Sequence, residues 1–221
     1  MLAIELISDI VPPLKTSDTG LQALSWMDAF RISHLPIVNH TEFLGLISDK
    51  DIYNLNMAEE PIGAHRLSLF SPYVFEDQHI YEVIGITSRL KLTVIPVLNR
   101  ENQYLGLITL HDLVTHFAGL SALQHPGGII VLDLNEHDYS LTQIAQIIES
   151  NDAKILSLYI SSDEDSTKLS VTLKINRTDL TSIIQTFERY NYDIKASYMK
   201  EDDTDNMYKS RYDLFMRYLN I

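Results

Sequence analysis

Leu35–Ile52 reads LPIVNHTEFLGLISDKDI, and Ile95–Leu113 reads IPVLNRENQYLGLITLHDL. The second stretch repeats the first in the order of its key residues, which pair as Pro36 with Pro96, Asn39 with Asn99, Gly45 with Gly106, and Asp51 with Asp112. The separation is 60 residues before the polar turn and 61 after it, so the second turn is one residue longer. This internal repeat decides the fold, because each copy is expected to form the same supersecondary unit.

Each copy predicts a β-hairpin followed by a helix. Short β-prone runs flank the polar turns NHTE and NRENQ, which is the pattern of two antiparallel strands. The glycine inside each return strand indicates a bulge or the close approach of another group. Ser48 and Thr109 then stand where a helix N-cap is favoured, and Asp51 and Asp112 fall in the first helical turn, where the helix dipole favours a carboxylate.

The pattern apolar-Pro-apolar-apolar, turn, apolar-Gly-apolar-Ile-Ser/Thr-x-x-Asp resembles the CBS domain, named for cystathionine β-synthase. Two such units in tandem resemble a Bateman module. The resemblance implies a mixed α/β (α+β) fold, with one CBS repeat at residues 1–57 and the other at residues 67–124. Within the first repeat, residues 1–11 have an apolar stripe of Leu2, Leu6 and Ile10, which predicts an amphipathic helix before Pro12-Pro13.

The second half of the chain has a different pattern. Strands are expected at 128–134, 153–161, 168–175 and 193–199, and helices at 140–150 and 178–191. This βαββαβ order defines a ferredoxin-like unit over residues 128–200. After a CBS pair it resembles an ACT domain, and the three-part order is similar to the bacterial acetoin-utilisation accessory (AcuB-like) family. A C-terminal helix at 203–221, with Tyr208, Tyr212, Phe215 and Leu219 on one stripe, is expected to cover the sheet or to bind a partner.

The loop after the first ACT-like strand, Asn135–Ser140, contains neither glycine nor proline. In amino-acid-binding ACT domains a Pro-Gly pair usually lets the ligand reach the backbone. We therefore expect this domain to serve assembly rather than effector binding.

The CBS resemblance implies an adenosyl ligand, such as AMP, ADP, ATP or S-adenosylmethionine. It assigns Ser48, Lys50 and Asp51 to one site, and Thr109, His111 and Asp112 to the other. The carboxylates suit the ribose hydroxyls, and the hydroxyls and helix N-termini suit phosphate. Because lysine is always charged and histidine is mostly neutral at pH 7, we expect the first set to bind phosphate more tightly.

Two alternatives remain open from the sequence. A Ser/Thr N-cap with an Asp three residues later also forms simply to cap a helix. His34, before Leu35-Pro36, either lines an adenine pocket or is a buried histidine with its hydrogen bonds satisfied.

Composition excludes several classes of protein. The chain of 221 residues has no cysteine, which rules out disulfides, thiolate metal sites and cysteine nucleophiles. Its 30 acidic and 17 basic residues give a net charge of −13, which argues against a nucleic-acid or anionic-membrane surface. There is no signal-peptide pattern, no run long enough to span a bilayer, and no catalytic or metal-binding motif. We therefore predict a cytoplasmic protein that is not an enzyme. The CBS and ACT resemblance implies a homodimeric regulatory protein; the alternative is a ligand-free scaffold that acts through homodimerisation and partner binding.

Overall fold

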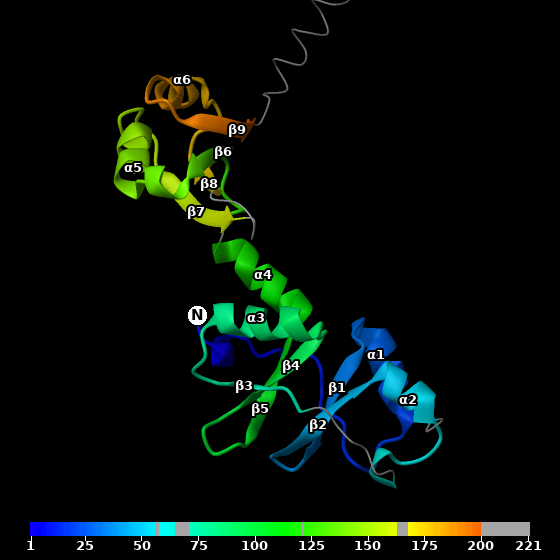
Figure 1. Ribbon diagram of the computed structural model, residues 1–221. Coiled ribbons are helices and arrows are strands. Elements are labelled where there is room, and N and C mark those ends of the chain that lie inside the picture. Colours follow the sequence, from blue (N-terminus) through cyan, green and yellow to red (C-terminus); the bar gives the residue numbers. More distant parts are fainter. Residues whose placement is uncertain (56–57, 65–70, 121, 163–167, 200–221) are drawn as a thin grey trace, which may run out of the picture. The chain divides into compact units, whose positions relative to one another are not determined.

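The computed structural model describes residues 1–55, 58–64, 71–120, 122–162 and 168–199 (Figure 1). The chain forms two compact units, Met1–Phe117 and Ala118–Ile221. The predicted C-terminal helix at 203–221 lies outside the described residues.

The first unit contains both repeats in the expected element order. The first repeat consists of α1 (Gly20–Phe30), β1 (His34–Asn39), β2 (Glu42–Ser48), α2 (Asp49–Leu55) and the 3₁₀ turn η2 (Ile62–Ala64). The second consists of β3 (Val74–Phe75), α3 (Ile80–Leu90), β4 (Val94–Leu98), β5 (Tyr104–Thr109) and α4 (Leu110–Leu120). The predicted hairpins are antiparallel in both repeats, β1 with β2 and β4 with β5.

The repeats also agree residue by residue in burial. Along α1 and α3 the succession of buried, half-buried and exposed residues is identical, because equivalent side chains face equivalent cores. Both helices end at a basic residue in the left-handed conformation, Arg31 with φ 56° and Lys91 with φ 54°. The 60-residue offset thus describes the three-dimensional repeat as well as the sequence.

The strand glycines have the roles expected from the hairpin pattern. Gly45 lies beside a bulge in the β1–β2 ladder and has φ 148°, a conformation that side chains disfavour. Gly106 lies beside the matching bulge in the β4–β5 ladder, and a Cβ atom there would collide with the Ile7 side chain. The first glycine is required by its backbone conformation and the second by a close neighbour.

The prediction of an amphipathic helix at residues 1–11 is wrong. Only the short 3₁₀ turn η1 (Ala3–Leu6) forms there. The Ala3 N–H donates to the Gln78 carbonyl at 2.9 Å and the Ser8 N–H to the Leu107 carbonyl at 2.8 Å, so backbone groups that a longer helix would use are bonded to the second repeat. Leu6 is fully buried in the core of that repeat, whereas Ile10 is 73% exposed. The apolar residues are spaced like a helix but pack as an extended segment.

The second unit has the predicted βαββαβ order. It consists of β6 (Gly128–Asn135), the 3₁₀ turn η3 (Glu136–Asp138), α5 (Leu141–Glu149), β7 (Ile155–Ser162), β8 (Lys168–Ile175), α6 (Thr181–Arg189) and β9 (Asp193–Tyr198). The strands are antiparallel in the order β7-β8-β6-β9, which is the ferredoxin-like arrangement.

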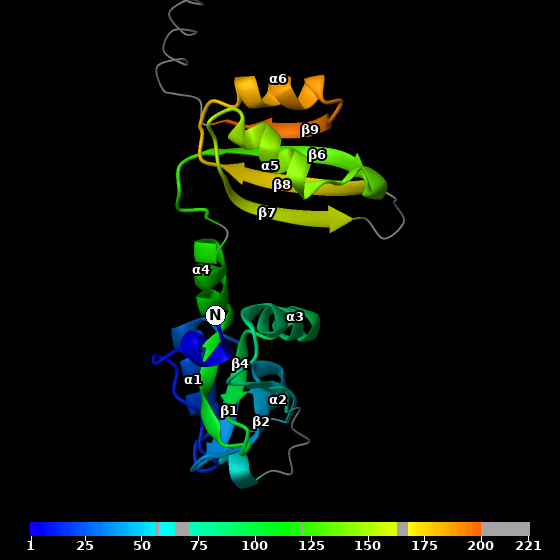
Figure 2. The same cartoon turned by 90° about the vertical axis from the view of Figure 1, so that its left-hand side faces the viewer.

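Helices α5 and α6 cover one face of this sheet (Figure 2). Alternate residues of β6 and β8 point into the core, among them Ile130, Leu132, Val171 and Leu173, and they pack around Phe187 of α6. Burial thus alternates along β6 and over the later part of β8, as expected for strands with one face on a core, whereas β7 runs from half-buried residues to exposed ones.

Candidate functional site

The candidate ligand residues of the second repeat lie where β5 meets α4. Thr109 donates its hydroxyl hydrogen to Asp112 Oδ2 at 2.6 Å, and the Asp112 N–H donates back to Thr109 Oγ1 at 3.1 Å. The Thr109 N–H also reaches Asp112 Oδ2, at 3.4 Å. Within the described residues, Asp112 Oδ1 has no hydrogen bond in this arrangement. The pair thus caps α4 and still presents a carboxylate oxygen for a ligand hydroxyl.

The first repeat forms the same cap. Ser48 donates to Asp51 Oδ2 from its hydroxyl at 2.7 Å and from its N–H at 2.9 Å, and the Asp51 N–H returns a bond to Ser48 Oγ at 3.2 Å. Lys50 between them is exposed. Since both pairs cap a helix, the capping geometry alone does not distinguish a ligand site from a structural one.

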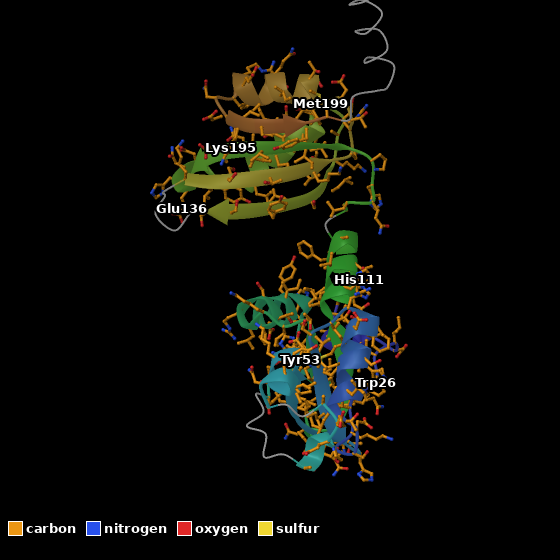
Figure 3. All side chains as sticks on the ribbon, turned by 90° about the vertical axis from the view of Figure 1, so that its right-hand side faces the viewer. Trp26, Tyr53, His111, Glu136, Lys195 and Met199 are labelled. Atoms are coloured by element: carbon orange, nitrogen blue, oxygen red, sulfur yellow. The ribbon has the colours of Figure 1, made fainter. Side chains whose placement is uncertain are left out.

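A cavity of about 550 Å³ distinguishes the second set. We call it the second cleft. His111, at the start of α4, is one of its lining residues and is labelled in Figure 3. Its walls come from the N-terminal segment, the end of α1, and the start of α4, and are Ser8, Ile10, Val11, Phe30, Arg31, Ile32, Thr93, Thr109, Leu110, His111, Asp112 and Val114. All three residues predicted for this site, Thr109, His111 and Asp112, are therefore brought together.

Arg31 is a residue of this cleft that the sequence did not assign to it. It belongs to the first repeat, and its guanidinium forms an ion pair with Asp28 at 3.1 Å with 86% of the arginine side chain exposed. An exposed pair of this kind contributes little stability and is easily exchanged for another anion. The signal in the sequence was a basic residue at the same place in both repeats, Arg31 and Lys91, but its proximity to Thr109 depends on tertiary packing.

The first set, Ser48, Lys50 and Asp51, has fewer described neighbours. By the 60-residue offset, Ser8 and Ile10 of the second cleft correspond to positions 68 and 70, which lie outside the described residues. Ser48 and Asp51 are therefore seen as a helix cap, and Lys50 as an exposed cation beside it.

Comparison with known families decides what the repeats are. The family model of the CBS domain matches residues 5–58 and again residues 67–119. These two segments are CBS domains. The prediction of a tandem CBS pair is thus confirmed, and the hairpin, the Ser/Thr cap and the aspartate lie inside each matched segment.

Solved structures similar to the CBS pair include three of interest. A CBS domain pair/ACT domain protein from Thermotoga maritima is 18% identical, with a TM-score of 0.47 over 54% of this chain and 98% of its own. A putative acetoin utilization protein (AcuB) from Vibrio cholerae is 23% identical, with a TM-score of 0.48 over 56% and 95%. CBSX2 in complex with AMP is 15% identical, with a TM-score of 0.46 over 53% and 96%. Likeness at this level transfers neither ligand nor activity.

His34 lies at a junction between the two CBS domains. Its Nδ1 is 3.0 Å from Thr93 Oγ1 and accepts the Thr93 N–H at 3.4 Å. Burial lowers the pKa of the imidazole below 6.5, although Asp49 and Asp51 act in the opposite direction. The histidine is thus hydrogen-bonded and half-buried and is absent from the walls of the second cleft, and its role in lining an adenine pocket stays a prediction.

The second unit has a polar cavity of about 670 Å³ at the loop after β6. Its polar groups largely satisfy one another: Lys168 pairs with Asp133 at 2.7 Å, and the Tyr192 hydroxyl donates to Gln143 Oε1 at 2.8 Å. The loop folds as η3, with the Asn135 amide bonded to Asp138. These contacts do not test the assembly role, which stays a prediction.

In the part of the chain that the structure describes, no group of three or more His, Cys, Asp or Glu side chains is placed to hold a metal ion. No helix among those residues is long and apolar enough to cross a bilayer.

Proposed function

We propose that this protein is a cytoplasmic regulatory sensor whose CBS pair binds an adenine nucleotide or a related adenosyl ligand in the second cleft. The observation that supports this most directly is the composition of the 550 Å³ cavity. It combines apolar walls, a helix N-terminus, a carboxylate and two basic side chains. The apolar walls suit a base, the carboxylate suits a ribose, and the helix N-terminus and the basic side chains suit a phosphate.

Each part of the cleft has a role in this proposal. Phe30 and Ile32 flank the base, and Asp112 accepts from the ribose hydroxyls through its unbonded oxygen. Arg31 and His111 face the phosphate near the N-terminus of α4, where the helix dipole also favours an anion. AMP, ADP, ATP and S-adenosylmethionine all have the required adenosyl group. The protein would report ligand binding without chemical change.

This proposal reverses the order of the two sites expected from Lys50 and His111. That order compared one basic residue from each repeat. Arg31 adds a permanent charge to the second cleft from the opposite repeat, and a guanidinium binds phosphate through two parallel hydrogen bonds. We therefore propose the second cleft as the tighter site.

Calorimetric titration with AMP, ADP, ATP and S-adenosylmethionine tests the proposal. Asp112→Ala should abolish or weaken binding of the preferred ligand by roughly 10- to 100-fold, the loss expected for a charge-assisted hydrogen bond. Asp51→Ala is the matched control, because it removes the equivalent cap from α2 without touching the second cleft. Absence of heat with all four ligands, or equal loss in the two variants, would contradict the assignment.

One observation favours the second candidate, a scaffold that acts through homodimerisation. An apolar groove of about 480 Å³ lies between α3 and α4, where Leu110, Val114 and Phe117 are 47%, 61% and 44% exposed. Its lining residues are Ile84, Thr87, Ser88, Lys91, Leu92, Thr93, Leu110, Leu113, Val114 and Phe117, of which only Lys91 is charged. In a chain with net charge −13, this is a face on which two copies avoid like-charge contact.

The equivalent hollow in the first repeat is polar. It is smaller, about 360 Å³, and is lined by Leu24, Met27, Asp28, Arg31, Ile32, Ser33, Asp49 and Tyr53. Val114→Glu should therefore dissociate a homodimer, whereas Tyr53→Glu, at the equivalent position, should not. Light scattering on both variants tests whether this face holds a dimer together, and a monomeric wild-type protein would exclude the scaffold.

A further inference from the structure

Ser33 and Thr93 are equivalent residues that meet between the two CBS domains. They lie immediately before β1 and β4, 60 positions apart. The Ser33 N–H donates to Thr93 Oγ1 at 2.9 Å. His34 Nδ1 lies 3.0 Å from the same hydroxyl and 3.4 Å from the Thr93 N–H, and the imidazole tautomer sets which group donates to the hydroxyl contact. The hydroxyl of Thr93 therefore accepts from Ser33 and contacts His34 across the junction.

The carbonyl groups of the same two residues hold the helices that carry the candidate site residues. The Ser33 carbonyl accepts the N–H of Asp49, the first residue of α2, at 3.1 Å. The Thr93 carbonyl accepts the N–H of Leu110, the first residue of α4, at 3.0 Å. Three hydrogen bonds thus connect the N-terminus of α2 to Ser33, Ser33 to Thr93, and Thr93 to the N-terminus of α4.

We propose that Thr93 is a positioning residue that couples the two CBS sites, so that a ligand fixing the start of α4 also restrains the start of α2. Thr93 lines the second cleft, whereas Asp49 precedes Lys50 and Asp51 of the first set. The coupling is reciprocal by thermodynamic necessity, so occupation of either site changes the other. The ligand-dependent part of this inference rests on the function proposed above.

Variants of Thr93 separate the hydroxyl from the shape of the side chain. Thr93→Val keeps the branched shape and removes the acceptor of the Ser33 N–H, while Thr93→Ser keeps the hydroxyl. Ser33→Ala is the matched control at the equivalent position, because the junction uses only the backbone of Ser33. All variants are made in the full chain.

The first measurement needs no ligand. Amide hydrogen exchange is followed by NMR at Asp49 and Leu110. Thr93→Val should raise the exchange rate at both amides, by roughly five- to tenfold at Asp49, which is the equilibrium equivalent of one ordinary hydrogen bond. Thr93→Ser and Ser33→Ala should leave both rates near the wild-type values. An unchanged rate at Asp49 in Thr93→Val overturns the coupling, whatever happens at Leu110.

The second measurement adds AMP as the probe. In the wild-type protein, exchange should slow at Leu110 and at Asp49; in Thr93→Val it should slow at Leu110 alone. Protection confined to Leu110 in the wild-type protein overturns the coupling but retains the second cleft as a ligand site. Lack of protection at both amides counts against AMP binding in this cleft, and the ligand-free rates then decide the coupling.

Discussion

Ser33 donates its backbone N–H to the hydroxyl of Thr93 at 2.9 Å, and the two residues hold the same position in successive repeats. Two identical partners at a pseudo-twofold junction would each make the same bond to the other. Here only threonine supplies a hydroxyl to the junction, and His34 from one repeat adds a second bond to it. The two CBS domains are therefore similar in fold but make different contacts where they meet. Equivalent residues of the two repeats can thus serve as variant and control.

Arg31 should contribute to phosphate binding in the second cleft. Arg31→Gln is expected to weaken binding of AMP or ATP by roughly 10- to 100-fold, because a charge-assisted hydrogen bond is lost. Lys91→Gln is the matched control: Lys91 also ends a helix in the left-handed conformation but does not line that cleft. Calorimetry on both variants provides the comparison. Equal losses of affinity in the two variants would show a general effect of positive charge and no specific contact from Arg31.

Thr87 should be a source of instability. Its side chain is 2% exposed, and its hydroxyl has no hydrogen-bond partner within the described residues. Thr87→Val removes the buried hydroxyl and keeps the shape, so we expect an increase in unfolding free energy of about 1 kcal/mol, the lower end of the cost of an unsatisfied polar group. Urea denaturation measures it. A loss of stability would mean that the hydroxyl has a partner after all, in a dimer or a ligand.

Gly106 should not tolerate a side chain while Ile7 remains. Gly106→Ala forces a contact with Ile7 and is expected to cost about 1–3 kcal/mol, as overpacking does. Adding Ile7→Ala should recover part of that loss, so the two changes are non-additive in a double-mutant cycle. Gly85→Ala, in α3 with no heavy atom within 4 Å of the new Cβ, should instead stabilise. If the double mutant is as unstable as the sum of the single changes, the close approach is not the cause.

The stability of the CBS pair should fall on mild acidification through His34. The pKa of His34 lies below 6.5 in the folded protein, chiefly because of burial, so the unfolded chain takes up a proton first. Stability is therefore fully present above about pH 6.5 and is lost as the pH falls from there towards the folded pKa. Urea midpoints at pH 7.5 and pH 5.5 test this. The difference should shrink in His34→Gln and persist in His40→Asn, a change at an exposed turn; an undiminished difference in His34→Gln would assign the effect to other groups.

The ACT-like unit should serve assembly. Deletion of residues 127–221 is expected to weaken oligomerisation and to leave nucleotide affinity within a few fold, because the second cleft is built entirely from residues 8–114. Light scattering and calorimetry on the shortened protein measure the two properties separately. An unchanged number of subunits per particle would refute the assembly role. Lost nucleotide affinity would place part of the ligand site in the second unit.

Local pattern was sufficient for much of the fold. The duplicated Pro, Gly and Asp positions predicted both hairpins, and the hydroxyls at Ser48 and Thr109 predicted where α2 and α4 begin. The strands predicted at 153–161 and 168–175 lie side by side in one sheet, as β7 and β8. These features depend on neighbours within a few residues, since strand alternation and helix capping are local properties of the chain.

Other features depend on residues that are distant in the sequence. The spacing of Leu2, Leu6 and Ile10 suits a helix, yet hydrogen bonds to Gln78 and Leu107 hold the segment extended. Arg31 reaches the cleft of Thr109, and Ser33 meets Thr93, only because the two repeats pack against each other. The sequence by itself determined the two CBS units and the βαββαβ unit, because periodicity and caps act locally. Tertiary structure alone decided which residues share a cleft or a junction, because packing between repeats brings together groups that are separated by 60 or more positions in the chain.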